Sequence, residues 1–393
     1  MKKQHKNAAV IDVPDYKTLK EIIVHGTEMG GDKKMLVYLD KNKAEHTKTY
    51  NDEWKDMSEM ATCYYLDGLT GKKKIAIISE NCYEWICGYY ASLISGNISV
   101  PMDCKLPAED LEDQLIRCEC DALIYSDKYA AMVENFKQNP AMTVKVYYCT
   151  SDFDEYLKKG RDELAKGNTA AVDAEVKPDD LACIVYTSGT TGKSKGVMLT
   201  HYNVVNNGKA IGDCMDLSTA DRMMIQVPMF HCFGMVLAMT ASVTHGTTMS
   251  PITRFSPRKG LACINREKIT CFHGVPTMFI AMLGHEDFDK TDFSYMRTGI
   301  MAGSPCPIKT MEEVIEKMNM SEICITYGQT EASPATTMSK TTDSIEQRVN
   351  TVGGAIFGVE CRIVDPETNE ELPDDTDGEF VARGYNIMKG YYK

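Results

Sequence analysis

Short apolar runs that alternate with helical patterns constrain the fold of this 393-residue chain more than any other feature. Between residues 50 and 125, strand-like runs are separated by segments whose apolar side chains recur at helical spacing. The predicted strands are 74–79, 98–102 and 122–125, and the predicted helices cover 50–69, 81–95 and 107–118. Strands and helices in this order favour a parallel sheet covered by helices.

A polar stretch from about residue 151 to 180 interrupts the pattern, and the alternation then resumes. The further expected strands are 181–186, 223–227, 247–249, 270–272, 297–301 and 323–326, with helices that include 233–244, 279–284 and 309–320. In the tail, 359–364 and 379–382 flank a turn and are typical of antiparallel strands. The sequence predicts an α/β fold: two doubly wound, mostly parallel sheets with covering helices and a small β-barrel-like unit, divided as 1–180, 181–335 and 336–393.

Size and charge exclude several classes of protein. A chain of this length is enough for two or three structural units. The net charge of −13 and pI near 5.2, without a concentrated basic patch, predict that nucleic acid is not a partner. No apolar run approaches the ~20 residues of a membrane span. The 15 cysteines are scattered through apolar runs, and the start lacks a signal-peptide pattern, so we expect reduced thiols and a cytoplasmic protein.

One loop has the composition of a phosphate-binding site. The segment 185–201, VYTSGTTGKSKGVMLTH, combines glycines, hydroxyls and cations. Glycine allows close approach of the backbone to a ligand, and Ser188, Thr190 and Thr191 supply hydrogen-bond donors. We therefore expect this loop to contact phosphate groups.

The same loop departs from the P-loop of NTPases. Gly192-Lys193-Ser194 matches the end of that motif, but Thr187 occupies the position of its first glycine. Residues 197–200 favour a strand, and a helix is expected only after Asn203. A P-loop continues directly into a helix, so the sequence favours another backbone setting.

Three further segments follow predicted strands, where open α/β sheets bind ligands. ITYGQTE, 325–331, offers an aromatic ring, a hydroxyl and a carboxylate; VPMFHCFG, 227–234, places one imidazole in an apolar run; MAGSPCP, 301–307, is a turn of small residues. Each also has a structural interpretation: capping and packing, a hydrogen-bonded core histidine, and a plain strand-to-helix connection. The residues alone leave both interpretations open.

Together these segments resemble the adenylate-forming superfamily of acyl-CoA synthetases, luciferases and peptide-synthetase adenylation domains. The YTSGTTGKSKG loop, PMFHCFG, YGQTE and the closing GEFVARG with GYY follow in that family's order. HGVPTMFIAML and RTGIMAGSPCP are most similar to the medium-chain fatty-acyl-CoA synthetases. The resemblance covers essentially the whole chain.

The resemblance implies two steps: a carboxylic acid and ATP give acyl-AMP and pyrophosphate, and coenzyme A then displaces AMP to form a thioester. It implies ATP, Mg²⁺ and coenzyme A as ligands, and a medium- or long-chain fatty acid as the partner substrate. The family includes monomers and dimers. Its usual C-terminal domain, with a lysine for adenylation, is expected to be absent, so this fragment should bind ATP with little or no adenylation.

The resemblance also assigns residue roles. Tyr327 and Gly328 would lie at the adenine, with Gly303 and Ser304 lining the purine; Thr330 would contact the α-phosphate, and Glu331 with Thr191 would hold Mg²⁺. His231 would lie at the mouth of the acyl pocket. The phosphate-binding loop would comprise Thr187, Ser188, Gly189, Thr190, Thr191, Gly192, Lys193 and Lys195, with Lys195, Thr330, Glu331 and His231 as the catalytic residues.

Alternative functions remain open at this point. An aryl acid could replace the fatty acid. An amino-acid-activating domain normally has an aspartate near the His231 segment, and 227–237 contains no acid. A nucleotide-binding remnant that serves an interaction is the non-enzymatic alternative.

Overall fold

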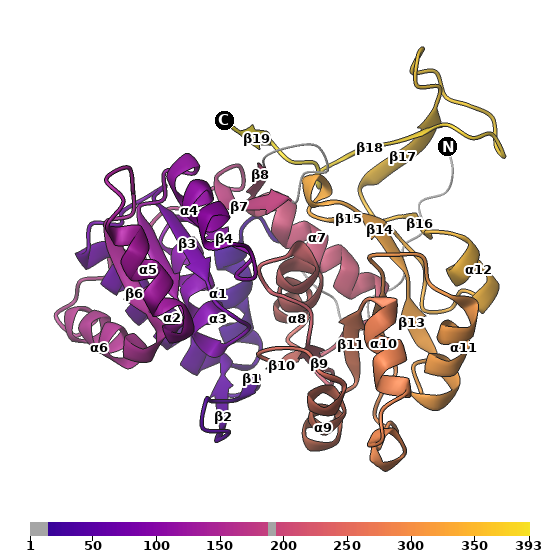
Figure 1. Ribbon diagram of the computed structural model, residues 1–393, viewed down its shortest axis with the longest axis horizontal. Coiled ribbons are helices and arrows are strands. Elements are labelled where there is room, and N and C mark those ends of the chain that lie inside the picture. Colours follow the sequence, from indigo (N-terminus) through magenta and orange to yellow (C-terminus); the bar gives the residue numbers. More distant parts are fainter. Residues whose placement is uncertain (1–14, 188–193) are drawn as a thin grey trace.

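The structure, a computed structural model, describes residues 15–187 and 194–393. Two seven-stranded sheets lie side by side and form most of the molecule (Figure 1). The first sheet has the order β19-β8-β7-β4-β3-β5-β6. Its strands are β3 (Lys74–Ile78), β4 (Ile98–Pro101), β5 (Ala122–Tyr125), β6 (Val146–Cys149), β7 (Leu181–Thr187), β8 (Lys195–Thr200) and β19 (Gly390–Tyr392). The strands from β7 to β6 are parallel, and β8 and β19 are antiparallel additions at one edge.

The second sheet has the order β13-β12-β11-β9-β10-β1-β2. Its strands are β1 (Lys34–Leu39), β2 (Glu45–Thr49), β9 (Arg222–Ile225), β10 (Thr248–Pro251), β11 (Cys271–Gly274), β12 (Thr298–Met301) and β13 (Glu322–Cys324). Only β2 runs antiparallel to its neighbour. The predicted α/β class with two mostly parallel sheets is therefore confirmed.

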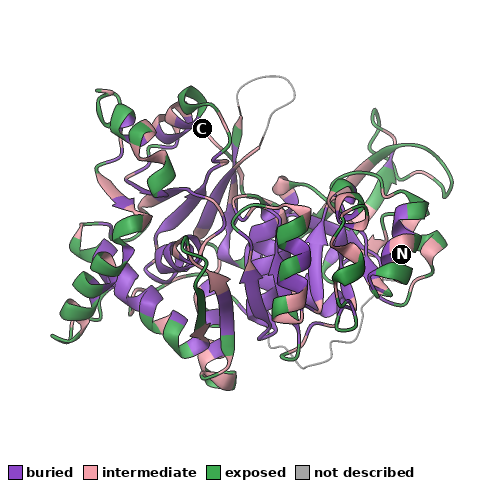
Figure 2. Cartoon of the chain, turned by 60° about the horizontal axis from the view of Figure 1, so that its bottom comes forward, coloured by how far each residue is buried: buried purple, intermediate pink, exposed green. Residues whose placement is uncertain are grey.

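Helices lie between the sheets and on both outer sides. The helices are α1 (Leu19–Gly30), α2 (Tyr50–Leu66), α3 (Tyr83–Ile94), α4 (Ala108–Arg117), α5 (Ala130–Lys137), α6 (Phe153–Leu164), α7 (His201–Cys214), α8 (Ala241–Thr244), α9 (Pro257–Glu267), α10 (Pro276–Leu283), α11 (Ile308–Lys317) and α12 (Ile345–Asn350). The largest core cluster joins α1, α2, α3 and α7 to the inner faces of both sheets. Figure 2 shows the buried strands and the exposed outer faces of the peripheral helices.

Strand periodicity explains why both sheets are buried on two faces. In β3, Ile75 and Ile77 join the central core, whereas Ala76 and Ile78 join the cluster beneath α4 and α5. Successive side chains of a strand point to opposite faces, so a strand between two helical layers must be apolar throughout. This is the pattern of continuous apolar runs that the sequence displays.

The sheets do not divide the chain at residue 180. β7, which was expected to open the second half, instead pairs with β4 of the first sheet through the register Ser99↔Cys183. Conversely, β1 from the first half pairs with β10 of the second sheet. Local apolar patterns indicate strands but carry no information about which strand becomes the neighbour.

Two segments differ from the sequence prediction in their secondary structure. The polar stretch after residue 151 contains α6, which buries only Phe153, Leu157 and Gly160 at helical spacing. Gly160 is required there, because a Cβ atom would lie 1.7 Å from the backbone oxygen of Glu59 on α2. The helix expected at 233–244 begins as a π-helix, Phe233–Thr240, and continues as α8.

The antiparallel tail forms two small sheets. β14 (Thr326–Gly328), β15 (Ala335–Met338) and β16 (Gly354–Ala355) form one, and β17 (Val359–Val364) pairs with β18 (Glu379–Gly384) in the other. The β17–β18 ribbon projects from the upper side of the molecule in Figure 1. Residues 336–393, predicted as a small barrel-like unit, contribute strands to these two sheets and, through β19, to the first seven-stranded sheet.

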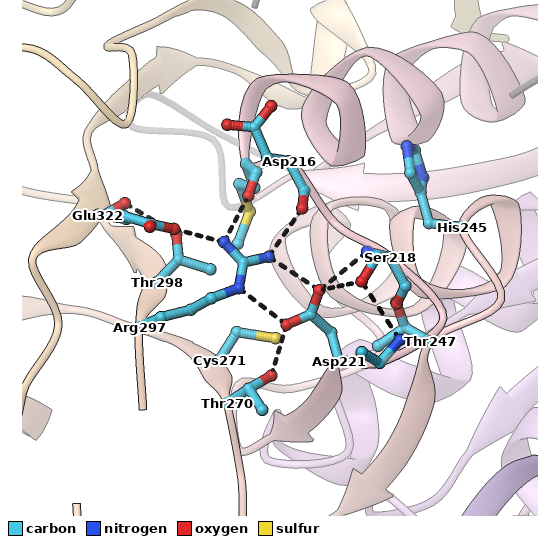
Figure 3. Close-up of polar contacts among 12 residues, drawn as sticks. Asp216, Ser218, Asp221, His245, Thr247, Thr270, Cys271, Arg297, Thr298 and Glu322 are labelled. Carbon is cyan, nitrogen blue, oxygen red and sulfur yellow. Dashed lines mark hydrogen bonds and ion pairs between the residues drawn. The ribbon is translucent and has the colours of Figure 1, made fainter. Parts of the chain in front are cut away.

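The amino edge of the second sheet is held by a partly buried ion network (Figure 3). Arg297 donates from Nε and Nη2 to the two carboxylate oxygens of Asp221, at 2.9 and 2.8 Å. It also donates to the backbone oxygen of Asp216 and to Glu322. Burial raises the pKa of Asp221, but the Arg297 contacts outweigh it and hold that pKa below its usual value. The network fixes the starts of β9, β12 and β13 relative to one another.

Across 15–187 and 194–393, none of the helices combines the length and the apolar character that a bilayer span requires.

Candidate functional site

The predicted ligand-binding segments meet at the carboxyl edge of the second sheet. β9, β11, β12 and β13 are parallel neighbours, so the residues that follow each strand emerge at the same edge. His231 follows β9, Gly303 and Ser304 follow β12, and the segment from Tyr327 to Glu331 follows β13. The topology therefore brings together segments that lie up to 100 residues apart.

Glu331 lies in a tight turn that glycine makes possible. Thr330–Ala332 forms a single 3₁₀ turn after β14. A Cβ atom on Gly328 would lie 1.8 Å from the backbone oxygen of Pro334, so no larger residue fits. The Asn207 side chain of α7 holds both backbone groups of Ala335, at 3.1 and 2.8 Å. The turn is thus fixed from both sides and presents Thr330 and Glu331, which are half-buried.

Tyr327 and the Gly303–Ser304 turn offer surfaces for a flat ligand. The Tyr327 side chain is 41% exposed, and its ring meets Phe380 of β18 edge-on at 5.2 Å. Gly303 adopts a left-handed conformation with φ of 86°, which a side chain disfavours. Both Gly303 and Ser304 are exposed. An aromatic ring and an open backbone turn are the groups against which a purine can stack and pack.

His231 is positioned by backbone contacts. Its Nδ1 atom accepts a hydrogen bond from the Phe233 amide at 3.1 Å. Asn81, in the loop between β3 and α3, holds the preceding residues, donating to the Val227 oxygen and accepting from the Met229 amide, both at 2.9 Å. Loss of solvent around the ring lowers the pKa of His231, although Asp103 opposes this change. In the neutral ring Nε2 therefore carries the proton and is the available donor.

The glycine-rich loop closes a β-hairpin between β7 and β8. Thr187 pairs with Lys195 across the hairpin. Predicted ligand contacts of Ser188, Gly189, Thr190, Thr191, Gly192 and Lys193 lie outside the described residues. The far end of the loop is anchored: Arg117 of α4 donates to the Ser194 oxygen at 3.1 Å, and Gln114 donates to its hydroxyl at 3.0 Å. A strand rather than a helix follows the loop, which confirms that it is not a P-loop.

Residues 388–391, which lead into β19, connect the hairpin to the Glu331 turn. The Met388 amide donates to the Glu331 backbone oxygen at 2.9 Å, and the Lys389 amide donates to Met198 of β8 at 3.0 Å. The Tyr391 hydroxyl then donates to Glu331 Oε1 at 2.8 Å, and the Lys195 ammonium lies 4.9 Å from the centre of the Tyr391 ring. Residue chemistry alone does not single out Tyr391, because a tyrosine in a short aromatic run is not distinctive.

The chemistry of Glu331 fits a hard divalent cation. Within the described parts of the chain, its Oε1 atom bonds Tyr391 and its Oε2 atom accepts no hydrogen bond. Carboxylate oxygens are the ligands that Mg²⁺ prefers. Burial, with a further contribution from the Glu331 charge, raises the pKa of the Cys232 thiol to about 12. The Glu331 carboxylate therefore acts electrostatically on Cys232, the residue after His231.

Comparison with known proteins identifies the family of the chain. The sequence pattern of a family described as AMP-binding enzyme matches residues 25–392. The putative acyl-CoA synthetase YngI of Bacillus subtilis is 41% identical over 343 residues, covering 81% of this chain and 62% of YngI. The mitochondrial medium-chain acyl-CoA ligase ACSF2 of Danio rerio is 31% identical over 374 residues, covering 88% of this chain and 61% of ACSF2.

The fold has a close counterpart among solved structures. The inhibitor-bound N-terminal domain of FACL13 from Mycobacterium tuberculosis aligns with a TM-score of 0.85 at 22% identity, covering 96% of this chain and 91% of that domain. The chain spans about three-fifths of the length of the curated relatives it matches. On the family match over nearly its whole length, this chain belongs to the AMP-binding enzyme family of adenylate-forming proteins.

Proposed function

We propose that the chain supplies the nucleotide and acyl site of an AMP-forming acyl-CoA ligase, an acid–thiol ligase. A carboxylate oxygen of a medium- or long-chain fatty acid attacks the α-phosphorus of ATP, giving acyl-AMP and pyrophosphate. The thiolate of coenzyme A then attacks the acyl carbon and releases AMP. The relatives named as acyl-CoA synthetase and acyl-CoA ligase support this choice of substrates.

One observation carries the proposal: a single segment, residues 388–391, which leads into β19, connects the glycine-rich hairpin to the Glu331 turn through Met388, Lys389 and Tyr391. A phosphate-binding loop and a carboxylate ligand for Mg²⁺ must act on the same triphosphate. Their direct connection supports one shared site rather than two unrelated turns.

We assign the remaining residues the roles that the resemblance to the adenylate-forming family implies. Tyr327 stacks on adenine, with Gly328, Gly303 and Ser304 lining the purine. Thr330 donates to the α-phosphate, and Lys195 with the loop 187–193 surrounds the β- and γ-phosphates. Glu331, together with Thr191 of the loop, would hold Mg²⁺, which would neutralise phosphate charge.

The site acts by alignment and charge stabilisation. The attacking carboxylate is already an anion, so the first step needs no general base. Preorganised donors aimed at developing charge supply the main acceleration in such reactions. His231, whose neutral ring offers an Nε2 donor near the Glu331 turn, orients the carboxylate of the substrate.

Equilibrium binding tests the proposal. Isothermal titration should show that a hydrolysis-resistant acyl-AMP analogue with a medium-length alkyl chain binds this chain more tightly than ATP·Mg²⁺. Glu331→Ala should weaken binding of ATP·Mg²⁺, with little effect on the analogue, which needs no metal. If the analogue and AMP bind with equal affinity, the acyl group does not contribute to binding. That result would argue against an acyl site and favour a nucleotide-binding remnant.

A further inference from the structure

Tyr391 occupies a central position between two parts of the nucleotide site. It lies on β19, opposite Val197 of the antiparallel neighbour β8. Its hydroxyl reaches Glu331 Oε1 at 2.8 Å, and the ammonium of Lys195 lies 4.9 Å from the centre of its ring. The side chain is 43% exposed, so burial alone does not dictate this geometry. Two specific contacts, one from each end of the side chain, account for its orientation.

The Tyr391 hydroxyl distinguishes the two carboxylate oxygens of Glu331. Oε1 accepts the Tyr391 hydrogen bond, and within the described residues Oε2 has no such partner. A tyrosine hydroxyl has one O–H group, and that of Tyr391 donates to the Glu331 carboxylate. The Met388 amide holds the backbone oxygen of the same glutamate. The segment 388–391 therefore holds Glu331 at both its main chain and its side chain.

The ring of Tyr391 contacts Lys195, at the end of the glycine-rich loop. Lys195 is the first residue of β8 and is exposed. A lysine ammonium over an aromatic face gains about 0.5–1 kcal/mol at an exposed site, enough to favour one orientation of a flexible side chain. Tyr391 thus holds the cation at the base of the glycine-rich loop on the side of Glu331.

We propose that Tyr391 is a positioning residue of the nucleotide site: its hydroxyl orients the Glu331 carboxylate for the cation of ATP·Mg²⁺, and its ring orients Lys195 toward the phosphates. This inference rests on the proposed function, because ATP·Mg²⁺ is the ligand on which it depends. The two ends of the side chain have separable effects, which allows a test by substitution.

The test is isothermal titration of the 393-residue chain with ATP, in the presence of Mg²⁺ and in the presence of EDTA. Tyr391→Phe removes only the hydroxyl, so it should lower the affinity for ATP·Mg²⁺ by about threefold to tenfold and leave metal-free ATP within about twofold. Tyr391→Leu also removes the ring, so its affinity for metal-free ATP should fall below that of Tyr391→Phe.

The neighbouring tyrosine provides a matched control. Tyr392 also donates to a carboxylate, Glu119 Oε2 at 3.1 Å, but on a residue outside the site. Tyr392→Phe should therefore leave both affinities unchanged. Thermal unfolding of each variant checks that the fold is retained, and the ratio of the two affinities is insensitive to a uniform loss of folded protein.

The outcomes distinguish failure of the proposed function from failure of the positioning role of Tyr391. If the unsubstituted chain binds ATP without any gain from Mg²⁺, or if Glu331→Ala leaves that gain intact, the metal role of Glu331 is wrong and the inference fails with it. If Glu331→Ala removes the gain but Tyr391→Phe does not, only the positioning role is overturned. Tighter binding of ATP·Mg²⁺ by Tyr391→Phe would also overturn it, because the hydroxyl would then compete with the cation.

Discussion

The Nδ1 atom of His231 accepts a hydrogen bond from the backbone amide of Phe233 at 3.1 Å. This contact selects the neutral tautomer with the proton on Nε2, so His231 can donate one hydrogen bond to a ligand. His231→Ala should lower the affinity for the acyl-AMP analogue by about threefold to tenfold, the effect of one lost hydrogen bond. Isothermal titration measures this change.

His231→Gln serves as the conservative control, because its side-chain amide keeps an N–H donor. It should bind the analogue more tightly than His231→Ala, and both variants should bind ATP·Mg²⁺ as the unsubstituted chain does. Equal loss of affinity for both ligands would show that His231 maintains the local fold instead of contacting the acyl group.

The buried His273 side chain should make the unfolding free energy depend on pH. Its Nε2 atom donates to the Leu237 oxygen at 2.9 Å and its Nδ1 atom accepts from the Ile300 amide at 3.1 Å, so the neutral ring is fully satisfied. Burial lowers the pKa of His273 to about 4, whereas a histidine in the unfolded chain titrates near 6.5. Between these values only the unfolded chain binds the proton, so stability falls as the pH drops from about 6.5 toward 4.

Urea unfolding at a series of pH values measures the slope of the unfolding free energy against pH. His201 contributes in the same direction, because burial also lowers its pKa to about 4. His273→Gln should therefore reduce the slope by about one proton without abolishing it. Identical slopes for the two proteins would show that His273 is protonated in the folded state.

The Arg297–Asp221 pair should be essential for stability. Asp221 is only 4% exposed, and Arg297 supplies a bidentate contact to it. Arg297→Met leaves this carboxylate buried without its partner, which costs about 3 kcal/mol or more of unfolding free energy. The control is Lys317→Met, which removes an exposed pair with Glu313 and should change stability by less than about 0.5 kcal/mol. Similar losses of unfolding free energy in Arg297→Met and Lys317→Met would show that the Arg297–Asp221 pair is not essential for stability.

Gly328 tests whether the geometry of the Glu331 turn matters. Gly328→Ala brings a Cβ atom against the Pro334 oxygen, and backbone on both sides cannot move aside easily. We expect a loss of about 2 kcal/mol in stability and weaker binding of ATP·Mg²⁺. Gly30→Ala, at a position where the nearest atom is 3.7 Å away, should be neutral in both assays. Unchanged nucleotide affinity in Gly328→Ala would show that the turn tolerates displacement.

Sequence patterns located individual strands more readily than their partners. Ile75 to Ile78 form a buried strand because apolar residues occupy both faces, and that pattern is visible in the sequence. Helix α6 escaped prediction because Phe153 and Leu157 form a narrow apolar stripe in a charged segment. The pairing of β7 with β4 depends on packing between distant elements, which no local pattern records.

The candidate site was predictable in part, because some of its residues follow strands that are visible in the sequence. His231, Gly303 and Tyr327 each follow an apolar strand, and parallel strands place such residues at one edge. Tyr391 lies 60 residues beyond Glu331, and their contact depends on β19 returning to β8. Such a contact arises from tertiary structure, so the sequence alone gave no signal for it.

A crystal structure of this chain with the medium-chain acyl-AMP analogue bound tests the central claim most directly. The account predicts adenine against the Tyr327 ring, with Gly303 and Ser304 beside it, and the acyl group passing His231. Binding of the adenosine at another surface, or an alkyl chain directed away from His231 into solvent, would contradict it.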